Sequence, residues 1–245
     1  MASGPHRSLG QWRSPGLPGP TGDRSRWGRS RVRPPEPAPV TNAYPARRYV
    51  RWKSGALATT TVHSRRAVFV DRDGTLNPDL HYLKDPSQLE LYRGVADSLR
   101  LAHRHGFLVV CVTNQSGIER GFYTVDDVER IHLRLNELLG SHGARVDAFY
   151  YCPHAPEHGC SCRKPGTVLF EQARRDWDID FATSAVLGDR SLDILAGKRI
   201  GLATAAVRPR GHEAEVDAEL ARDQLAPDII SDSFRGALMR VLARG

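Results

Sequence analysis

Residues 67–75 read Ala-Val-Phe-Val-Asp-Arg-Asp-Gly-Thr, a short apolar run that ends in two carboxylates, Asp71 and Asp73. A short continuous apolar run is typical of a strand buried on both faces. Two acidic residues at positions i and i+2 project to the same side while the chain stays extended. A lone Asp after a strand is also a common turn or helix cap, so this pair alone leaves both interpretations open.

Apolar runs and amphipathic stretches alternate from residue 67 to the end of the chain. We expect strands over 67–70, 107–113, 146–151, 185–187, 203–207 and 228–230, and helices over 94–105, 124–139, 167–177, 191–200, 211–225 and 233–242. Thr124 and Asp127 form a capping-box pattern at the start of the second helix. Continuous apolar strands between helices indicate a doubly wound α/β fold with a parallel sheet.

Ligands of such folds bind beyond the carboxyl ends of the strands, and two further expected strands end in polar residues. Thr113-Asn114-Gln115-Ser116 closes strand 107–113, and Gly188-Asp189-Arg190 follows strand 185–187. A third carboxylate from another strand could complete an oxygen cage for Mg²⁺, which prefers carboxylate, carbonyl and water ligands. Three polar strand ends in one sheet therefore favour a binding site over unrelated turns.

Three of the four cysteines lie close to a histidine, in Cys152-Pro153-His154 and Cys160-Ser161-Cys162. Cys₃His is a closed tetrahedral zinc set, which is structural rather than catalytic. Three cysteines pair badly as disulfides, and the spacings differ from the two Cys-x₂-Cys pairs of a nucleic-acid-binding finger. His158 is the rival of His154 as the fourth ligand.

The basic charge of the chain belongs to its first quarter. The formal net charge is +7, but residues 1–66 hold 13 basic and 2 acidic side chains, against 22 and 26 in the remainder. This distribution excludes a uniformly basic nucleic-acid-binding domain. No apolar run approaches the roughly 18 residues of a membrane span.

Residues 1–50 contain 9 of the 16 prolines and lack apolar periodicity. We therefore expect a disordered leader over residues 1–64 and one domain over residues 65–245. An organelle transit peptide and an over-long translation start are alternative interpretations of the leader.

Four segments match, in order, the motifs of the haloacid dehalogenase superfamily: Asp71-x-Asp73-Gly74-Thr75, Thr113, Lys164 and Gly188-Asp189-x-x-x-Asp193. From about residue 67 to about residue 207 the chain resembles, more closely, the D-glycero-D-manno-heptose 1,7-bisphosphate phosphatases and the related histidinol-phosphatase domain. The resemblance implies a Rossmann-type phosphatase fold with a small zinc-binding loop, and it favours His154 as the zinc ligand.

The resemblance also implies a role for each motif residue. Asp71 would be the nucleophile that forms an aspartyl-phosphate, and Asp73 the general acid and base. Mg²⁺ would be held by Asp71, the backbone carbonyl of Asp73 and Asp189. Thr113 and Lys164 would bind the equatorial phosphate oxygens.

The segments beside the motifs resemble those of the heptose enzymes more than those of the histidinol phosphatases. The resemblance places substrate contacts at Asp79, Tyr82, Asn114, Gln115, Ser116 and Arg163. The bidentate fork of Arg163 suits a second phosphate. Arg190 departs from the pattern, because many heptose enzymes carry lysine there; we expect it to serve as a cation near phosphate.

These observations predict a cytoplasmic, monomeric, Mg²⁺-dependent phosphatase that removes the 7-phosphate of a heptose 1,7-bisphosphate in nucleotide-activated heptose biosynthesis. The expected partner is this sugar phosphate, with no specific nucleic acid and no membrane. Histidinol phosphate, or another small phosphate monoester, is the alternative substrate. A non-catalytic protein that binds polyanions through the basic leader is the alternative of a different class, against which the intact catalytic motifs argue.

Overall fold

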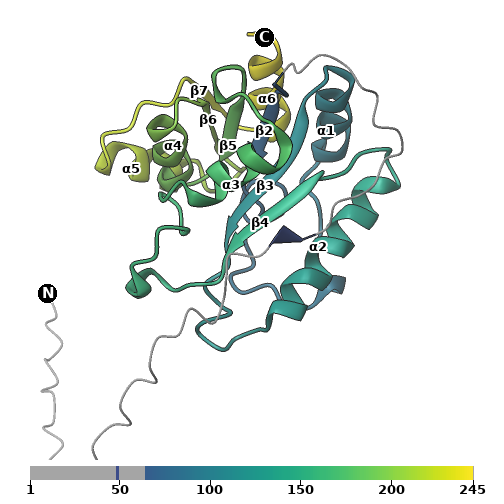
Figure 1. The fold of residues 1–245 in the computed structure, drawn as a ribbon, viewed down its shortest axis with the longest axis vertical. Coiled ribbons are helices and arrows are strands. Elements are labelled where there is room, and N and C mark those ends of the chain that lie inside the picture. The colour runs from purple at the N-terminus through teal and green to yellow at the C-terminus, as the bar shows by residue number, and fades with distance from the viewer. Residues whose placement is uncertain (1–47, 50–63, 245) are drawn as a thin grey trace, which may run out of the picture. The chain divides into compact units, whose positions relative to one another are not determined.

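The computed structural model of the chain describes residues 48–49 and 64–244. Six parallel strands in the order β4-β3-β2-β5-β6-β7 form a sheet with helices on both faces (Figure 1), which confirms the predicted doubly wound α/β fold. The parallel strands are β2 (Ala67–Val70), β3 (Leu108–Asn114), β4 (Ala148–Cys152), β5 (Ala185–Gly188), β6 (Ala203–Val207) and β7 (Ile229–Ser231).

The parallel part of the sheet begins at its interior strand β2 and extends from there in both directions. The chain adds β3 and β4 on one side of β2, then crosses back to add β5, β6 and β7 on the other. The strand order therefore reverses at β2, and the crevice at such a switch point is where open α/β sheets bind ligands.

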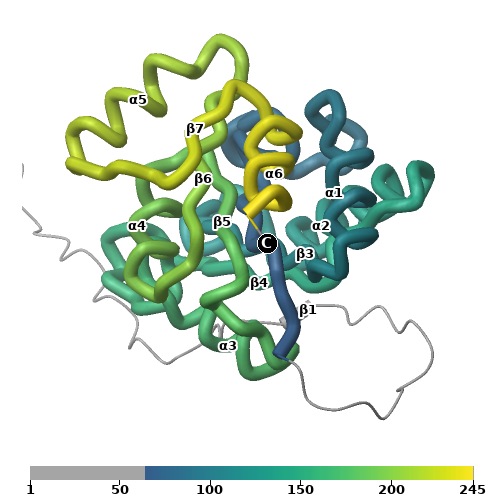
Figure 2. The backbone as a smooth tube through the Cα atoms, turned by 90° about the horizontal axis from the view of Figure 1, so that it is seen from above, coloured from purple at the N-terminus to yellow at the C-terminus, as the bar shows by residue number. Residues whose placement is uncertain are grey.

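Alternating side chains along the strands pack into two hydrophobic cores, one on each face of the sheet. Val68 and Val70 of β2 pack toward α1 (Val95–Arg104), α2 (Val125–Gly140) and α6 (Phe234–Leu242). Ala67 and Phe69 point the other way, toward α3 (Val168–Trp177) and α4 (Ser191–Arg199). Figure 2 shows α1 and α2 on one side of the strands and α4 on the other. The apolar strands are thus buried on both faces, as their composition indicates.

Helix α5 (Glu213–Arg222) packs outside α4 and β6 through a smaller apolar cluster that includes Val216 and Leu220. The capping box at the start of α2 is present: the Asp127 amide donates to the Thr124 hydroxyl at 3.2 Å, and the Thr124 amide donates to the Asp127 carboxylate at 2.8 Å. Three 3₁₀ helices are additional to the expected elements: η1 (Pro86–Gln88), η2 (Pro156–His158) and η3 (Phe181–Thr183).

Two residues of the predicted leader belong to the sheet. Strand β1 (Arg48–Tyr49) pairs antiparallel with β4 at its edge, so the expectation of disorder over residues 1–64 does not hold there. A strand of two residues offers no periodic pattern for a sequence to reveal. Apart from Ser64, which is described and exposed, the rest of that expectation concerns residues 1–47 and 50–63, which lie outside the described residues. Within the described residues, none of the helices is long and apolar enough to span a membrane.

Candidate active site and metal centre

The polar strand ends meet in a cleft of about 260 Å³ beyond the carboxyl ends of β2, β3 and β5. Every residue predicted to act in catalysis, magnesium binding or substrate binding lines it: Asp71, Asp73, Asp79, Tyr82, Thr113, Asn114, Gln115, Ser116, Arg163, Lys164, Asp189 and Arg190. These residues come from four separate segments of the chain. The parallel sheet brings together the segments that follow β2, β3 and β5, because these strands end at the same edge, and the loop after β4 adds Arg163 and Lys164.

Lys164 is buried at the centre of the cleft and fully hydrogen-bonded. Its ammonium lies 2.9 Å from Asp71 Oδ1 and 2.6 Å from Asp193 Oδ1, and it donates to the Val112 carbonyl at 2.8 Å. Burial alone would lower the pKa of Lys164, but the carboxylates of Asp193 and Asp71 outweigh it and raise the pKa above its ordinary value. The lysine therefore stays charged beside Asp71.

Three carboxylates surround this single ammonium. Oxygens of Asp71, Asp189 and Asp193 all lie within 4.8 Å of one another. Burial, together with the charges of Asp71 and Asp193, raises the pKa of Asp189 well above its ordinary value. Burial likewise raises the pKa of Asp193 to about 6, against the opposing charge of Lys164. The excess of negative charge and the hard oxygen donors fit a divalent cation such as Mg²⁺.

Two glycines allow these carboxylates to approach the backbone. A Cβ on Gly74, whose φ is +78°, would lie 2.1 Å from Asp189 Oδ2. A Cβ on Gly188 would lie 2.3 Å from the carboxyl carbon of Asp193. The glycine of the Asp-x-Asp-Gly-Thr motif is thus required for packing against the β5 end as well as for its positive φ.

Asp73 is not one of the three clustered carboxylates and is held by nitrogen donors. Arg72 donates to it through Nη2 at 2.7 Å and Nε at 3.1 Å, while Asn77 and Gln115 each donate at 3.0 Å. Burial would raise the pKa of Asp73, but Arg72 and the amide donors hold it below its ordinary value. One fifth of the side chain remains exposed. Asp73 is therefore an ionised group fixed at the edge of the cleft.

Several residues predicted to contact substrate have partners within the protein. Asn114 accepts from the Lys164 amide at 3.0 Å and donates to the Lys164 carbonyl at 3.3 Å, which fixes the main chain at the lysine. Arg190 forms an ion pair with Glu219 of α5 at 2.6 Å. Gln115 is buried, and its amide faces inward. Of these three, Arg190 is exposed, Asn114 is half-buried and Gln115 is buried.

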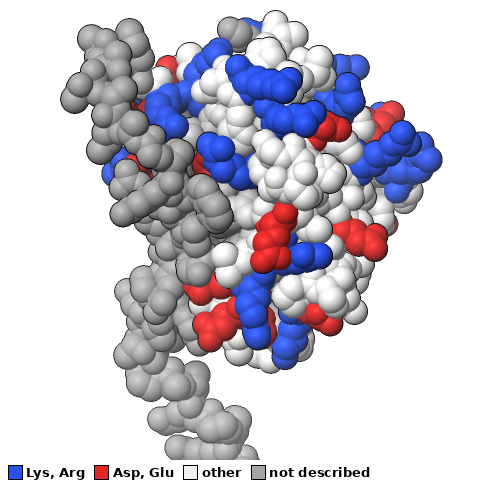
Figure 3. Space-filling model, turned by 90° about the vertical axis from the view of Figure 1, so that its right-hand side faces the viewer, with Lys and Arg blue, Asp and Glu red and all other residues white. Residues whose placement is uncertain are grey.

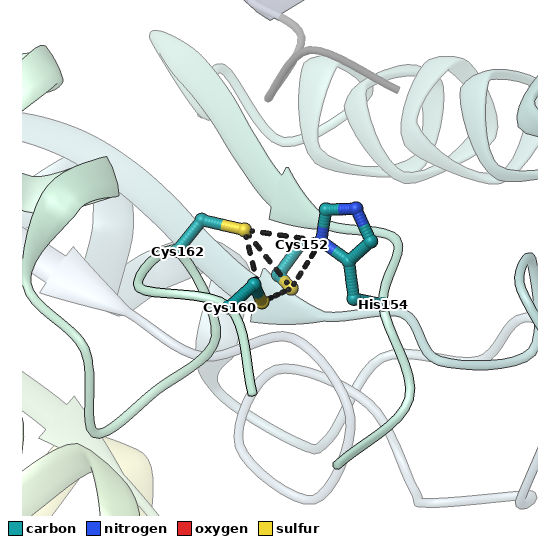
Figure 4. A group of neighbouring side chains, drawn as sticks. All are labelled: Cys152, His154, Cys160 and Cys162. Atoms are coloured by element: carbon teal, nitrogen blue, oxygen red, sulfur yellow. Dashed lines mark hydrogen bonds between the residues drawn. The ribbon is translucent and has the colours of Figure 1, made fainter. Parts of the chain in front are cut away.

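A second cluster lies between the end of β4 and the loop that leads to Lys164 (Figure 4). The three sulfur atoms of Cys152, Cys160 and Cys162 are 3.3–3.5 Å apart, and Nδ1 of His154 lies 3.3 Å from Cys162 and 3.6 Å from Cys152. These separations exceed a disulfide bond and suit four ligands about 2.1–2.3 Å from a tetrahedral zinc ion. His158, the rival ligand, instead lies 2.7 Å from a Glu119 carboxylate oxygen.

Arg72, Tyr123 and Asp193 are polar lining residues that the sequence analysis did not assign a role. The motif spacing already contained a signal for Asp193, because it stands four residues after Asp189 on the first turn of α4. Arg72 stands between the two motif carboxylates, but its contact with Asp73 depends on a rotamer that no spacing fixes. Tyr123 reaches the cleft from the loop before α2, and no motif marks it.

This geometry, with a carboxylate beside a buried lysine and an acidic cluster at the ends of parallel strands, defines a hydrolase of the haloacid dehalogenase class. A family model described as HAD-hydrolase-like matches residues 161–237. The D-glycero-beta-D-manno-heptose-1,7-bisphosphate 7-phosphatase of Helicobacter pylori is 39% identical over 137 residues, which cover 56% of this chain and 79% of that protein. The enzyme of the same name from Haemophilus ducreyi is 35% identical over 173 residues, or 68% of this chain and 95% of that protein.

A solved structure of an enzyme with the corresponding name has a similar fold. The D,D-heptose 1,7-bisphosphate phosphatase from B. bronchiseptica, complexed with magnesium and phosphate, aligns with a TM-score of 0.66 and 28% identity over 74% of this chain and 99% of that chain. The chain belongs to the family of the D-glycero-D-manno-heptose-1,7-bisphosphate 7-phosphatases.

Proposed function

We propose that this chain is a Mg²⁺-dependent phosphatase that removes the 7-phosphate of D-glycero-D-manno-heptose 1,7-bisphosphate in nucleotide-activated heptose biosynthesis. The observation that carries the proposal is the pair of Asp71 and Lys164, 2.9 Å apart, beside the acidic cluster at the strand ends. The choice of substrate is supported by the relatives from H. pylori and H. ducreyi, which are named for this activity.

In the first step an oxygen of the Asp71 carboxylate attacks the phosphorus of the 7-phosphate. The bond between phosphorus and Asp71 forms as the bond to the sugar 7-oxygen breaks, and Asp73 gives its proton to that oxygen. The negative charge of a bound phosphate raises the pKa of a neighbouring carboxyl, so Asp73 takes up this proton as the substrate binds. Thr113 binds one equatorial oxygen, and Lys164 binds another by giving it the N–H group that faces Asp71 at 2.9 Å in the free site. Both contacts stabilise the charge that accumulates on these oxygens.

In the second step a water molecule attacks the phosphorus of the aspartyl-phosphate. Asp73 accepts a proton from this water, the bond between phosphorus and Asp71 breaks, and inorganic phosphate leaves. Magnesium, held by Asp71, Asp189 and the main-chain carbonyl of Asp73, would offset the repulsion between carboxylate and phosphate. Asp193 holds Lys164 in place at 2.6 Å throughout.

We propose that zinc occupies the Cys152, His154, Cys160 and Cys162 cluster and has a structural role. Arg163 and Lys164 directly follow the last of these ligands. A metal that fixes the loop lowers the entropy cost of holding the two cations at a phosphate. Arg163 would then contact the phosphate that stays on the sugar, and its guanidinium suits that oxyanion.

We further propose that the enzyme works as a cytoplasmic monomer without a nucleic-acid partner. Residues 67–245 carry 22 basic and 26 acidic side chains. Figure 3 shows both signs interspersed on the side of the molecule where α1 and α2 lie. The 22 basic and 26 acidic side chains of residues 67–245 leave a net charge of −4, which does not favour a polyanion. Light scattering during gel filtration measures the molar mass, which should be that of one chain, 27.2 kDa.

The proposal is tested by phosphate release in Mg²⁺ buffer from α- and β-heptose 1,7-bisphosphate and from histidinol phosphate, assayed side by side. Release from a heptose bisphosphate is expected, and release from histidinol phosphate alone would overturn the substrate. Asp71→Asn keeps the size and shape of the side chain but cannot form the aspartyl-phosphate, so it should abolish turnover without changing the circular dichroism spectrum. Retained turnover would exclude the mechanism.

A further inference from the structure

Gln115 is saturated by contacts inside the protein. The residue is only 2% exposed. Its amide nitrogen donates to Asp73 Oδ2 at 3.0 Å and to the Thr113 hydroxyl at 2.9 Å. Its amide oxygen accepts from the Tyr123 hydroxyl at 2.7 Å and from Arg72 Nη2 at 3.2 Å. A side-chain amide has two N–H donors and two acceptor lone pairs, so nothing remains for a substrate.

Only one orientation of this amide satisfies its neighbours. A flipped amide would turn its oxygen toward Asp73 Oδ2, an acceptor that already receives a hydrogen bond from Arg72 Nη2 at 2.7 Å. The flip would also turn N–H groups toward Arg72, which can only donate. Tyr123 completes the favourable orientation, because its hydroxyl supplies the second donor to the amide oxygen.

Tyr123 occupies a site built to receive its ring. The side chain is 6% exposed, and a Cβ on Gly117 would lie 2.4 Å from two carbons of the ring. The backbone at Gln115 is also fixed, because the main-chain N–H of Gln115 donates to the Cys152 carbonyl at the end of β4, at 2.7 Å. The tyrosine, the glutamine and the general acid thus form one continuous hydrogen-bonded chain.

We propose that Tyr123 and Gln115 are positioning residues that hold the Asp73 carboxylate for proton transfer, and that Gln115 does not contact the substrate. The inference rests on the proposed function, in which Asp73 protonates the departing sugar oxygen. It assigns a new role to Gln115, which the family resemblance places among the substrate contacts, and a role to Tyr123, which no motif marks. Loss of the Tyr123 hydroxyl leaves the amide oxygen with Arg72 alone, so the donors to Asp73 and Thr113 loosen.

The test exploits the difference between leaving groups. A sugar alkoxide needs a proton to depart, whereas p-nitrophenolate leaves as a stable anion without one. Phosphoryl transfer to Asp71 is measured in single turnovers, and kcat and KM in steady-state assays, for wild type and Tyr123→Phe with heptose bisphosphate and with p-nitrophenyl phosphate. We expect transfer from the sugar phosphate to slow about tenfold, with KM changed less than about twofold and the release of nitrophenol unchanged within about twofold.

Gln115→Leu should show the same selective loss to a larger extent. Tyr150→Phe is the matched control, because Tyr150 is a buried tyrosine whose hydroxyl donates to Asp176 at 2.8 Å. This control should leave both transfers unchanged. Equal slowing of both leaving groups, no slowing, or a rise in KM with unchanged kcat in Tyr123→Phe would overturn the inference. If heptose bisphosphate is not turned over, the proposed function fails, and the same comparison with another sugar monophosphate still decides the positioning role.

Discussion

Replacing Asp189 by asparagine removes one negative charge from the buried cluster and keeps the shape of the side chain. The new amide could still accept the hydrogen bond that the Thr75 hydroxyl donates to Asp189 Oδ1 at 2.8 Å. It would no longer repel Asp71 and Asp193, whose oxygens lie within 4.8 Å. We therefore expect this variant to be more stable than wild type without magnesium and to lose its activity.

The size of the effect follows from the distances. Two unit charges 4.8 Å apart repel by about 3.5 kcal/mol at an effective dielectric constant of about 20. Lys164 offsets one of the two repulsions that Asp189 feels, and relaxation reduces the other. We expect Asp189→Asn to raise the free energy of unfolding by about 1–3 kcal/mol, which corresponds to about 3–9 °C in Tm for a domain of this size.

The pH dependence has a defined sign. The pKa of Asp189 is raised in the folded protein, so its protonation stabilises the fold at low pH, and this stabilisation is lost as the pH rises through the folded-state pKa. The advantage of the asparagine variant should therefore be largest at pH values above the raised folded-state pKa of Asp189, and it should shrink as the pH falls through that pKa.

Thermal unfolding by circular dichroism measures these differences after dialysis against magnesium-free buffer, because a strong chelator would also remove zinc. Added Mg²⁺ should raise the Tm of wild type more than that of Asp189→Asn. Glu90→Gln, which neutralises an exposed carboxylate, is the control. It should change neither the Tm without magnesium nor the rise in Tm on adding Mg²⁺. An asparagine variant that is less stable than wild type without magnesium, or an equal response of both to Mg²⁺, would refute the reasoning.

Three further outcomes are expected. Cys160→Ala should lose bound zinc, lower the Tm and reduce kcat by about 100-fold, because the loop before Lys164 loosens. A variant that has lost its zinc by elemental analysis but keeps its kcat and Tm would contradict this. Gly74→Ala should cost at least about 100-fold in kcat, since its Cβ would lie 2.1 Å from Asp189 Oδ2, and near-normal kinetics would contradict the packing. Removal of residues 1–47, which keeps β1, should leave kcat/KM unchanged, whereas a large loss would favour a role for the leader.

The sequence predicted the sheet and the polar strand ends of the cleft because both depend on local patterns, whereas the resemblance implied the roles of Asp79, Tyr82, Arg163 and Lys164. Apolar runs such as 107–113 determine strands, and motif residues at their carboxyl ends must converge in a parallel sheet. Thr124 and Asp127 needed only a spacing of three residues to predict the start of α2.

The orientation of side chains within the cleft could not be predicted in this way. Gln115 and Asp73 are 42 residues apart, and whether the amide faces substrate or carboxylate depends on Tyr123 and Arg72 around it. Arg190 meets Glu219 only because α5 packs on α4, which no motif encodes. Such contacts depend on tertiary packing and rotamers rather than on spacing.

The most direct test of the central claim is ³¹P nuclear magnetic resonance of heptose 1,7-bisphosphate during turnover in Mg²⁺ buffer. The account predicts that the signal of the 7-phosphate is replaced by inorganic phosphate while the signal of the 1-phosphate persists. Loss of the 1-phosphate first, or no loss of either while histidinol phosphate is hydrolysed, would contradict it.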